Sequence, residues 1–243
     1  MQYTFTSSAN SGISLSTCGF RLWTDFLHNR KTPPYSSVTP ALWDRVTGDS
    51  NLSNPDIIFF THHHPDHYSL GMVRRALRLY PDAQVVMPEH PDCALFHPDI
   101  CVPLTGSTCR MKCGDLDLLF LRTVHEGKLF SDVPHYSLLI THKQHTIFLS
   151  GDSSLSSDPL LQFLAEQHID IAVLPFVWLT SGRGQTALTE IIRPSHLLIN
   201  HLPDAADDRF GYRKAAEKRL PLLSGKMDLR LILNPLQRES ITL

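Results

Sequence analysis

The chain has 243 residues, of which 42% are hydrophobic and 19% charged, and its formal net charge is −2. This composition excludes a disordered or fibrous protein and is typical of a soluble globular one with an α/β domain or at most two small domains. Because no run of like charge occurs, a bulk electrostatic attraction to nucleic acid or to an anionic membrane is also disfavoured.

The N-terminus and the cysteines suggest where the protein works. The first residues, MQYTFTSSANSGISLS, lack the basic and the unbroken apolar regions of a signal peptide. No stretch approaches the roughly 20 apolar residues of a membrane span. We therefore expect a cytoplasmic protein, not bound to a membrane, with reduced thiols. A zinc site built from Cys109 and Cys113 is disfavoured because a second ligand pair is missing.

The first part of the chain predicts short strands and one helix. Alternating apolar and polar residues predict strands over 3–6, 12–17 and 20–26. The Pro/Ser-rich stretch 31–40 is predicted to be a loop, which either lines a pocket or lies inert on the surface. The elements predicted next are a buried strand over 55–61, an amphipathic helix over 68–81 and a strand over 83–88.

The rest of the chain mixes hairpin strands with strand–helix units. The predicted strands are 116–124, 135–141, 145–152, 170–176, 196–201 and 228–233. Helices are predicted over 159–168, 185–193 and around 213–220, and residues 181–184 are predicted to be a loop. This mixture predicts helices packed on sheets, in a single domain over residues 1–243.

The stretch FFTHHHPDH places four histidines within six positions, directly after a predicted buried strand. His62 and His64 share one face of an extended chain, and a turn at Pro65 brings Asp66 and His67 round to a neighbouring position. Imidazole and carboxylate are ligands that zinc prefers. The stretch therefore predicts a metal site, in preference to a surface histidine cluster or a helix cap formed by Asp66.

These residues resemble the T-H-x-H-x-D-H signature of the metallo-β-lactamase superfamily. The family's later ligands also have counterparts, each at the end of a predicted strand: His125, Asp152 in a Gly-Asp turn, and His201. The resemblance runs from about Gly12 to His201. It implies an α/β fold (α+β in some schemes) arranged as a four-layer αββα sandwich.

The resemblance also implies a binuclear zinc site, with Mn²⁺ or Fe as alternatives. One ion would be bound by His62, His64 and His125, and the other by Asp66, His67 and His201. Asp152 would bridge the two ions, and Asp66 and Asp152 would be the catalytic carboxylates. Two adjacent cations make a hydroxide nucleophile available at neutral pH, so the expected reaction is hydrolysis of a small ester, lactone, thioester or phosphodiester.

Three further residues are candidates for supporting roles. Asp25 matches the aspartate with which the family often orients a ligand histidine, and an ordinary turn residue is the alternative. His135 is the rival of His125 as a ligand, and it is otherwise a candidate to support a ligand or to contact substrate. Arg183, between two glycines, either reaches an anionic substrate or lies in an exposed turn. His63 is expected to point away from the metal.

Several departures narrow the choice within the superfamily. The absence of an export signal and the aspartate at position 152 argue against a β-lactamase, and His64 argues against a flavo-di-iron oxidoreductase. Little chain follows His201, which argues against the helical domain of glyoxalase II, and no RNA-clamping arm of the transfer-RNA maturases is found. What remains is most similar to the compact branch of ascorbate-6-phosphate lactonase-like proteins, with a small-molecule substrate. The alternatives are a metallo-nuclease acting on RNA or DNA, or a mono-iron sulfur dioxygenase.

Overall fold

The computed structural model describes residues 1–223 and 225–243, and these form two compact units, each built on one seven-stranded sheet. The first unit comprises Met1–Thr105, Pro203–Arg209 and Leu233–Leu243, and the second comprises Gly106–Leu202 and Phe210–Ile232. Two large sheets with helices confirm the predicted α/β class. Within the described residues, no helix combines the length and the apolar character needed to cross a bilayer.

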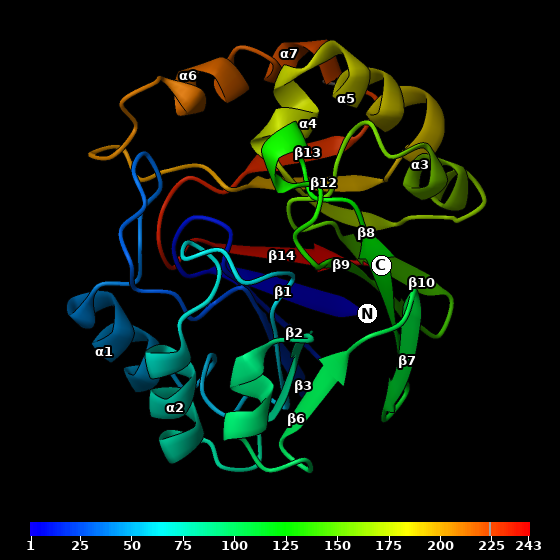
Figure 1. Cartoon of the computed structure of the whole chain (residues 1–243). Helices are drawn as coiled ribbons and strands as arrows, with labels where there is room; N and C mark the ends of the chain where they lie inside the picture. Colours follow the sequence, from blue (N-terminus) through cyan, green and yellow to red (C-terminus); the bar gives the residue numbers. More distant parts are fainter. Residues whose placement is uncertain (224) are drawn as a thin grey trace. The chain divides into compact units, whose positions relative to one another are not determined.

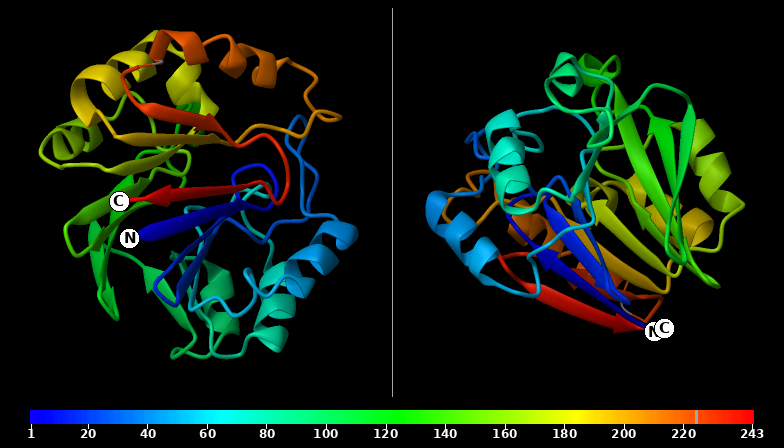
Figure 2. Two further views of the ribbon diagram at one scale, coloured as in Figure 1. Left: turned by 180° about the vertical axis from the view of Figure 1, so that it is seen from behind. Right: turned by 90° about the horizontal axis from the view of Figure 1, so that it is seen from below.

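The sheet of the first unit has the strand order β14-β1-β2-β3-β4-β5-β6. Its strands are β1 (Gln2–Ser7), β2 (Ile13–Thr17), β3 (Phe20–Thr24), β4 (Ile57–Phe59), β5 (Gln84–Pro88), β6 (Cys101–Leu104) and β14 (Arg238–Thr242). β3 to β6 are parallel to one another, and the other pairs are antiparallel. The two ends of the chain therefore meet on β1 and β14, where the Leu243 amide donates to the Met1 carbonyl oxygen at 2.9 Å (Figure 2).

Helices α1 (Pro40–Gly48) and α2 (Leu70–Leu79) pack on one face of this sheet (Figure 1). Helix α1 was not predicted from the sequence, although its start carries two helix signals. Thr39 caps the helix by accepting a hydrogen bond from the Leu42 amide, and a proline occupies its first turn. The hydrophobic spacing correctly predicted α2, which begins after the cap Ser69. A short 3₁₀ turn, η1 (Pro91–Leu95), follows β5.

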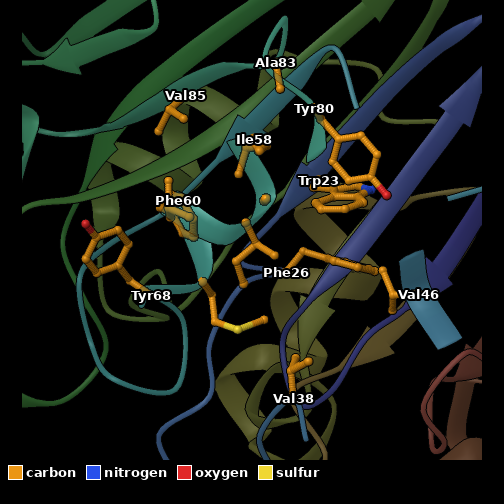
Figure 3. Packing of buried hydrophobic residues seen from close by; sticks show 14 of the residues in the cluster. Trp23, Phe26, Val38, Val46, Ile58, Phe60, Tyr68, Tyr80, Ala83 and Val85 are labelled. Carbon is orange, nitrogen blue, oxygen red and sulfur yellow. The ribbon is translucent and has the colours of Figure 1, made fainter. Parts of the chain in front are cut away.

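Aromatic residues fill the core between these helices and the sheet (Figure 3). The Trp23 ring stacks on Phe26, with centroids 4.7 Å apart, and meets Tyr80 edge-on at 5.6 Å. The ends of β3 and β4 are joined by the Asp25 amide, which donates to the Phe59 carbonyl oxygen at 2.9 Å. Because β3 and β4 are parallel, the residues that follow them come together at one edge of the sheet.

The sheet of the second unit has the strand order β13-β12-β11-β10-β9-β8-β7. Its strands are β7 (Thr108–Cys113), β8 (Leu116–Thr123), β9 (His135–His142), β10 (His145–Leu149), β11 (Ile171–Pro175), β12 (His196–Asn200) and β13 (Asp228–Leu231). β7 to β10 are antiparallel neighbours, and β10 to β13 are parallel. The carboxyl ends of β8, β10 and β12 therefore lie at the same edge of the sheet.

Helices gather on one face of the second sheet (Figures 1 and 2). They are α3 (Asp158–Ala165), α4 (Phe176–Thr180), α5 (Gly182–Thr186), the π-helical turn η3 (Ala187–Ile192), α6 (Tyr212–Glu217) and α7 (Leu220–Leu223), and a 3₁₀ turn, η2 (Lys128–Phe130), lies between β8 and β9. The predicted loop over 181–184 is wrong, because Ser181 caps α5 and accepts a hydrogen bond from the Gly184 amide at 3.0 Å. The two glycines in this stretch hid the helical signal.

Candidate metal centre

The histidine-rich stretch after β4 forms a tight turn at the edge of the first sheet. The His67 amide donates to the His64 carbonyl oxygen at 2.9 Å, so the chain reverses at Pro65 as predicted. The His62 ring lies 4.6 Å from the His64 ring and 4.0 Å from the His67 ring, between centroids. Three imidazoles of one short segment thus face one another.

His67 is held from behind by a buried carboxylate. Its Nδ1 lies 2.9 Å from Oδ2 of Asp25 and 3.2 Å from Oγ of Ser11. A carboxylate only accepts hydrogen bonds, so the proton of the His67 ring is on Nδ1 and the lone pair is on Nε2. Asp25 thus prepares His67 to bind a cation through Nε2.

The same carboxylate determines the tautomer of His62 through Thr61. The Thr61 amide donates to Oδ1 of Asp25 at 2.8 Å, and the Thr61 hydroxyl donates to Oδ2 at 2.7 Å. Because the single hydroxyl proton is used in this bond, the hydroxyl oxygen accepts from Nδ1 of His62 at 2.9 Å. The lone pair of His62 is therefore also on Nε2.

Asp66 lies beside His67 and is oriented by the loop after β1. Nε2 of His67 is 3.8 Å from Oδ2 of Asp66. The side-chain amide of Asn10 donates to that same oxygen at 3.3 Å. Neither Asn10 nor Ser11 was predicted from the sequence, because nothing in their local pattern indicates a contact with residues 56 positions away.

Two further histidines of the first unit, the buried His28 and the half-buried His63, have a lowered pKa. Burial lowers the pKa of His28 to about 4, and its Nε2 donates to the Ala9 carbonyl oxygen at 3.1 Å. Burial and the nearby His90 lower the pKa of His63 to about 4. The His63 ring stacks on His90 at 4.1 Å and not on its histidine neighbours, which agrees with the expectation that it turns away.

In the second unit, the segment after β8 pairs with the turn after β10. The Glu126 amide donates to the Asp152 carbonyl oxygen, and the Ser154 amide to the Val124 carbonyl oxygen, each at 2.7 Å. Nδ1 of His125 donates to the Glu126 carbonyl oxygen at 2.6 Å, so its lone pair is on Nε2. That nitrogen lies 3.8 Å from Oδ2 of Asp152.

His201 reaches the same carboxylate from the end of β12. Its Nε2 lies 3.2 Å from Oδ2 of Asp152, and its backbone adopts the left-handed conformation, with φ of 59°. This conformation is uncommon for a non-glycine residue. Two ligands that bind one tetrahedral ion at roughly 2.0–2.1 Å stand about 3.4 Å apart. The distance of each histidine, His125 and His201, from Asp152 therefore suits a cation bound by that histidine and the carboxylate together.

His135 and Arg183 have other partners. Nδ1 of His135 lies 2.7 Å from the Thr123 hydroxyl, which lies 3.2 Å from the Ser137 hydroxyl, and Ser137 donates to the Ser150 carbonyl oxygen at 2.7 Å. The edge of the His135 ring meets the His125 ring at 5.6 Å. Arg183 lies in α5 and pairs with Asp158 of α3 at 2.8 Å.

Seven residues supply the side-chain atoms that could hold a metal ion. They are His62, His64, Asp66 and His67 in the first unit and His125, Asp152 and His201 in the second. Four residues outside the predicted ligand set support them with hydrogen bonds: Asn10, Ser11, Thr61 and Glu126. Of these four, only Thr61 carried a signal, since it is the first residue of the T-H-x-H-x-D-H signature.

Comparison with known proteins identifies the fold. No family model and no curated protein matches the sequence. Among solved structures, Igni18, a metallo hydrolase from the archaeon Ignicoccus hospitalis, matches with a TM-score of 0.70 and 16% identity over 100% of both chains. The metallo-β-lactamase fold protein YhfI from Bacillus subtilis matches with a TM-score of 0.69 and 15% identity over 98% of both chains. The chain has the metallo-β-lactamase fold.

A third match shows that the metallo-β-lactamase fold also occurs within a longer protein. CmlA, a diiron β-hydroxylase from Streptomyces venezuelae, matches with a TM-score of 0.65 and 14% identity, over 99% of this chain and 54% of that one. None of these three is named as a lactonase, so the lactonase-like branch stays a prediction. At such low identity the likeness establishes the metallo-β-lactamase fold, and the chemistry is argued from the residues.

Proposed function

We propose that the protein is a metal-dependent hydrolase that cleaves a small ester, lactone or phosphodiester. The observation that carries this proposal is the common tautomer of three histidines. His62, His67 and His125 each donate from Nδ1 to a protein group, so each has its lone pair on Nε2. Burying three imidazoles with this tautomer next to carboxylates is an arrangement that suits a divalent cation.

We further propose that the ligands of the two units act together on two zinc ions. His62, His64 and His125 would hold one ion, and Asp66, His67 and His201 the other, with Asp152 between them. The motif resemblance and the fold support this assignment, as does the suitable ligand spacing around Asp152. When bound, such a pair of cations lowers the pKa of water and polarises the bond to be cleaved.

The two aspartates have distinct proposed roles. Asn10 donates to the Asp66 carboxylate and keeps it oriented, so that it can take a proton from the attacking water and pass it to the leaving oxygen. Asp152 lies close to both His125 and His201, and its negative charge offsets part of the positive charge of the cations. The substrate we propose is a small molecule.

One experiment tests the proposal directly. Protein purified without added metal is analysed for its elements and assayed on a nitrophenyl phosphodiester, an ester and a lactone. We expect about two zinc ions per chain and hydrolysis that is reduced at least about 100-fold in Asp152→Asn. The exposed Asp117→Asn is the matched control and should behave as the wild type. One iron per chain would contradict the two-zinc site, and hydrolysis unaffected by Asp152→Asn would contradict the assignment of Asp152.

A further inference from the structure

The second unit contains a cavity that the metal chemistry does not use. Its volume is about 590 Å³, within the roughly 300–1,000 Å³ that is usual for small-molecule sites. Its walls come from the end of β8, the segment that follows η2 and the first turns of α3. None of the seven candidate metal ligands lines it, so it is a separate site.

Each of these wall segments contributes apolar side chains to the cavity. Its apolar lining residues are Leu121, Val124, Val133, Pro159, Leu160 and Phe163. The segment leading into the cavity also exposes apolar side chains, since Leu129 is 93% and Phe130 44% exposed. A ligand with an apolar body would therefore remove apolar surface from water on entering.

Two opposite charges line the same cavity without pairing. Among the described residues that line it, Arg122 is the only cationic one and Asp132 the only anionic one. Across residues 1–223 and 225–243, neither of these side chains forms a hydrogen bond or an ion pair. The polar groups nearby are hydroxyls, and that of Thr123 is already engaged with His135 and Ser137. The two charges are thus available to a ligand.

We propose that this cavity binds a small zwitterionic molecule with an apolar body, of the chemical class of an apolar dipeptide. The forked guanidinium of Arg122 would take the carboxylate, and Asp132 the ammonium group. The apolar lining residues would contact the side chains of the dipeptide. A purely apolar ligand would form an ion pair with neither Arg122 nor Asp132. An anion or a cation would form an ion pair with only one of them.

The proposal is tested by calorimetric titration with the dipeptide Leu-Phe and with two matched ligands that each lack one charge. N-acetyl-Leu-Phe lacks the ammonium, and Leu-Phe amide lacks the carboxylate. We expect both to bind at least about tenfold more weakly than Leu-Phe. Binding is measured on the protein as purified and again after EDTA treatment, because free dipeptides also bind metal ions.

Variants connect each ligand charge to its residue. Asp132→Asn should weaken the binding of Leu-Phe about tenfold and leave the binding of N-acetyl-Leu-Phe unchanged. Arg122→Gln should weaken the binding of Leu-Phe about tenfold and leave the binding of Leu-Phe amide unchanged. Leu160→Trp should abolish the binding of all three ligands by filling the cavity. Arg110→Gln is the control, because the Arg110 side chain is exposed on β7 and does not line the cavity, and it should leave all three affinities unchanged. The proposal is overturned if Leu-Phe does not bind, if EDTA abolishes its binding, or if the variants fail to discriminate among the ligands.

Discussion

Nδ1 of His67 lies 2.9 Å from Oδ2 of Asp25, and neither side chain is more than 2% exposed. Oδ1 of the same carboxylate accepts from the Thr61 amide, so the carboxylate cannot turn without losing a buried hydrogen bond. Asp25 itself adopts a left-handed backbone, with φ of 49°. A single buried carboxylate thus directs two histidines, His67 directly and His62 through Thr61, to present Nε2 as the metal-binding atom.

Replacing Asp25 by asparagine should reverse the tautomer of His67. The amide oxygen would continue to accept from the Thr61 amide, which places the amide nitrogen, a donor, against Nδ1 of His67. Nδ1 would then have to accept, and the proton would move to Nε2, where it blocks a cation. We expect Asp25→Asn to bind zinc about 10–100-fold more weakly, measured by competition with a chromogenic chelator.

The control for this substitution is Asp44→Asn. The Asp44 side chain is 74% exposed, and its nearest cation, Arg75, is 3.7 Å away. This variant should bind zinc as the wild type does. If Asp25→Asn also kept wild-type affinity, the carboxylate would not determine the tautomer of His67.

Thr61→Val should weaken both metal binding and folding. Valine matches threonine in shape but can neither donate to Asp25 nor accept from His62, so two buried groups each lose one hydrogen bond. We expect the free energy of unfolding to fall by about 1–3 kcal/mol and zinc affinity to fall about tenfold. Thr61→Ser keeps the hydroxyl and should retain most of both. Equal losses in the serine and valine variants would show that packing of the methyl group, not the hydroxyl, is what matters.

The local part of the candidate site could be predicted from the sequence. The two-residue period of an extended chain predicts that His62 and His64 share a face, and Pro65 predicts the turn before His67. His125, Asp152 and His201 each come shortly after a strand of the second sheet, namely β8, β10 and β12. Because these three strands run in the same direction, the three ligands lie at the same edge of that sheet. Patterns spanning a few residues therefore predicted the ligand-bearing segments.

The supporting contacts could not be predicted in the same way. Asn10 and Asp66 are 56 positions apart, and Thr123 meets His135 only because β8 pairs with β9 in a register that places them opposite each other. Helix α1 was missed because its sequence contains tryptophan, threonine and glycine, which are weak helix formers. Burial of Trp43 and Val46 in the core outweighs that weakness.

Gly12→Ala should destabilise the first unit next to Asp25. A methyl group at Gly12 would overlap Oγ of Ser8 and come within 2.9 Å of the Asp25 carbonyl oxygen, which is backbone and cannot rotate away. We expect the free energy of unfolding, measured by denaturant titration, to fall by about 1–3 kcal/mol. Gly48→Ala meets no atom within 4 Å and should be neutral or slightly stabilising. A neutral result for Gly12→Ala would mean that the backbone near Asp25 adjusts easily.

The buried, neutral His28 should make the protein less stable in acid. The pKa of His28 is about 4 in the folded protein, against the ordinary value of 6.5 in the unfolded chain. Between these pH values the unfolded chain binds more protons than the folded one. The free energy of unfolding therefore falls as the pH drops below about 6.5. From pH 7 to pH 5 this one group should cost about 2 kcal/mol of unfolding free energy. Denaturant titrations of EDTA-treated protein at pH 7 and pH 5 measure this loss of unfolding free energy. The loss in His28→Gln should be smaller than in the wild type by that amount. His97→Gln is the control, because the His97 side chain is 68% exposed, and it should keep the full acid sensitivity. An unchanged loss in His28→Gln would mean that other groups cause the acid sensitivity.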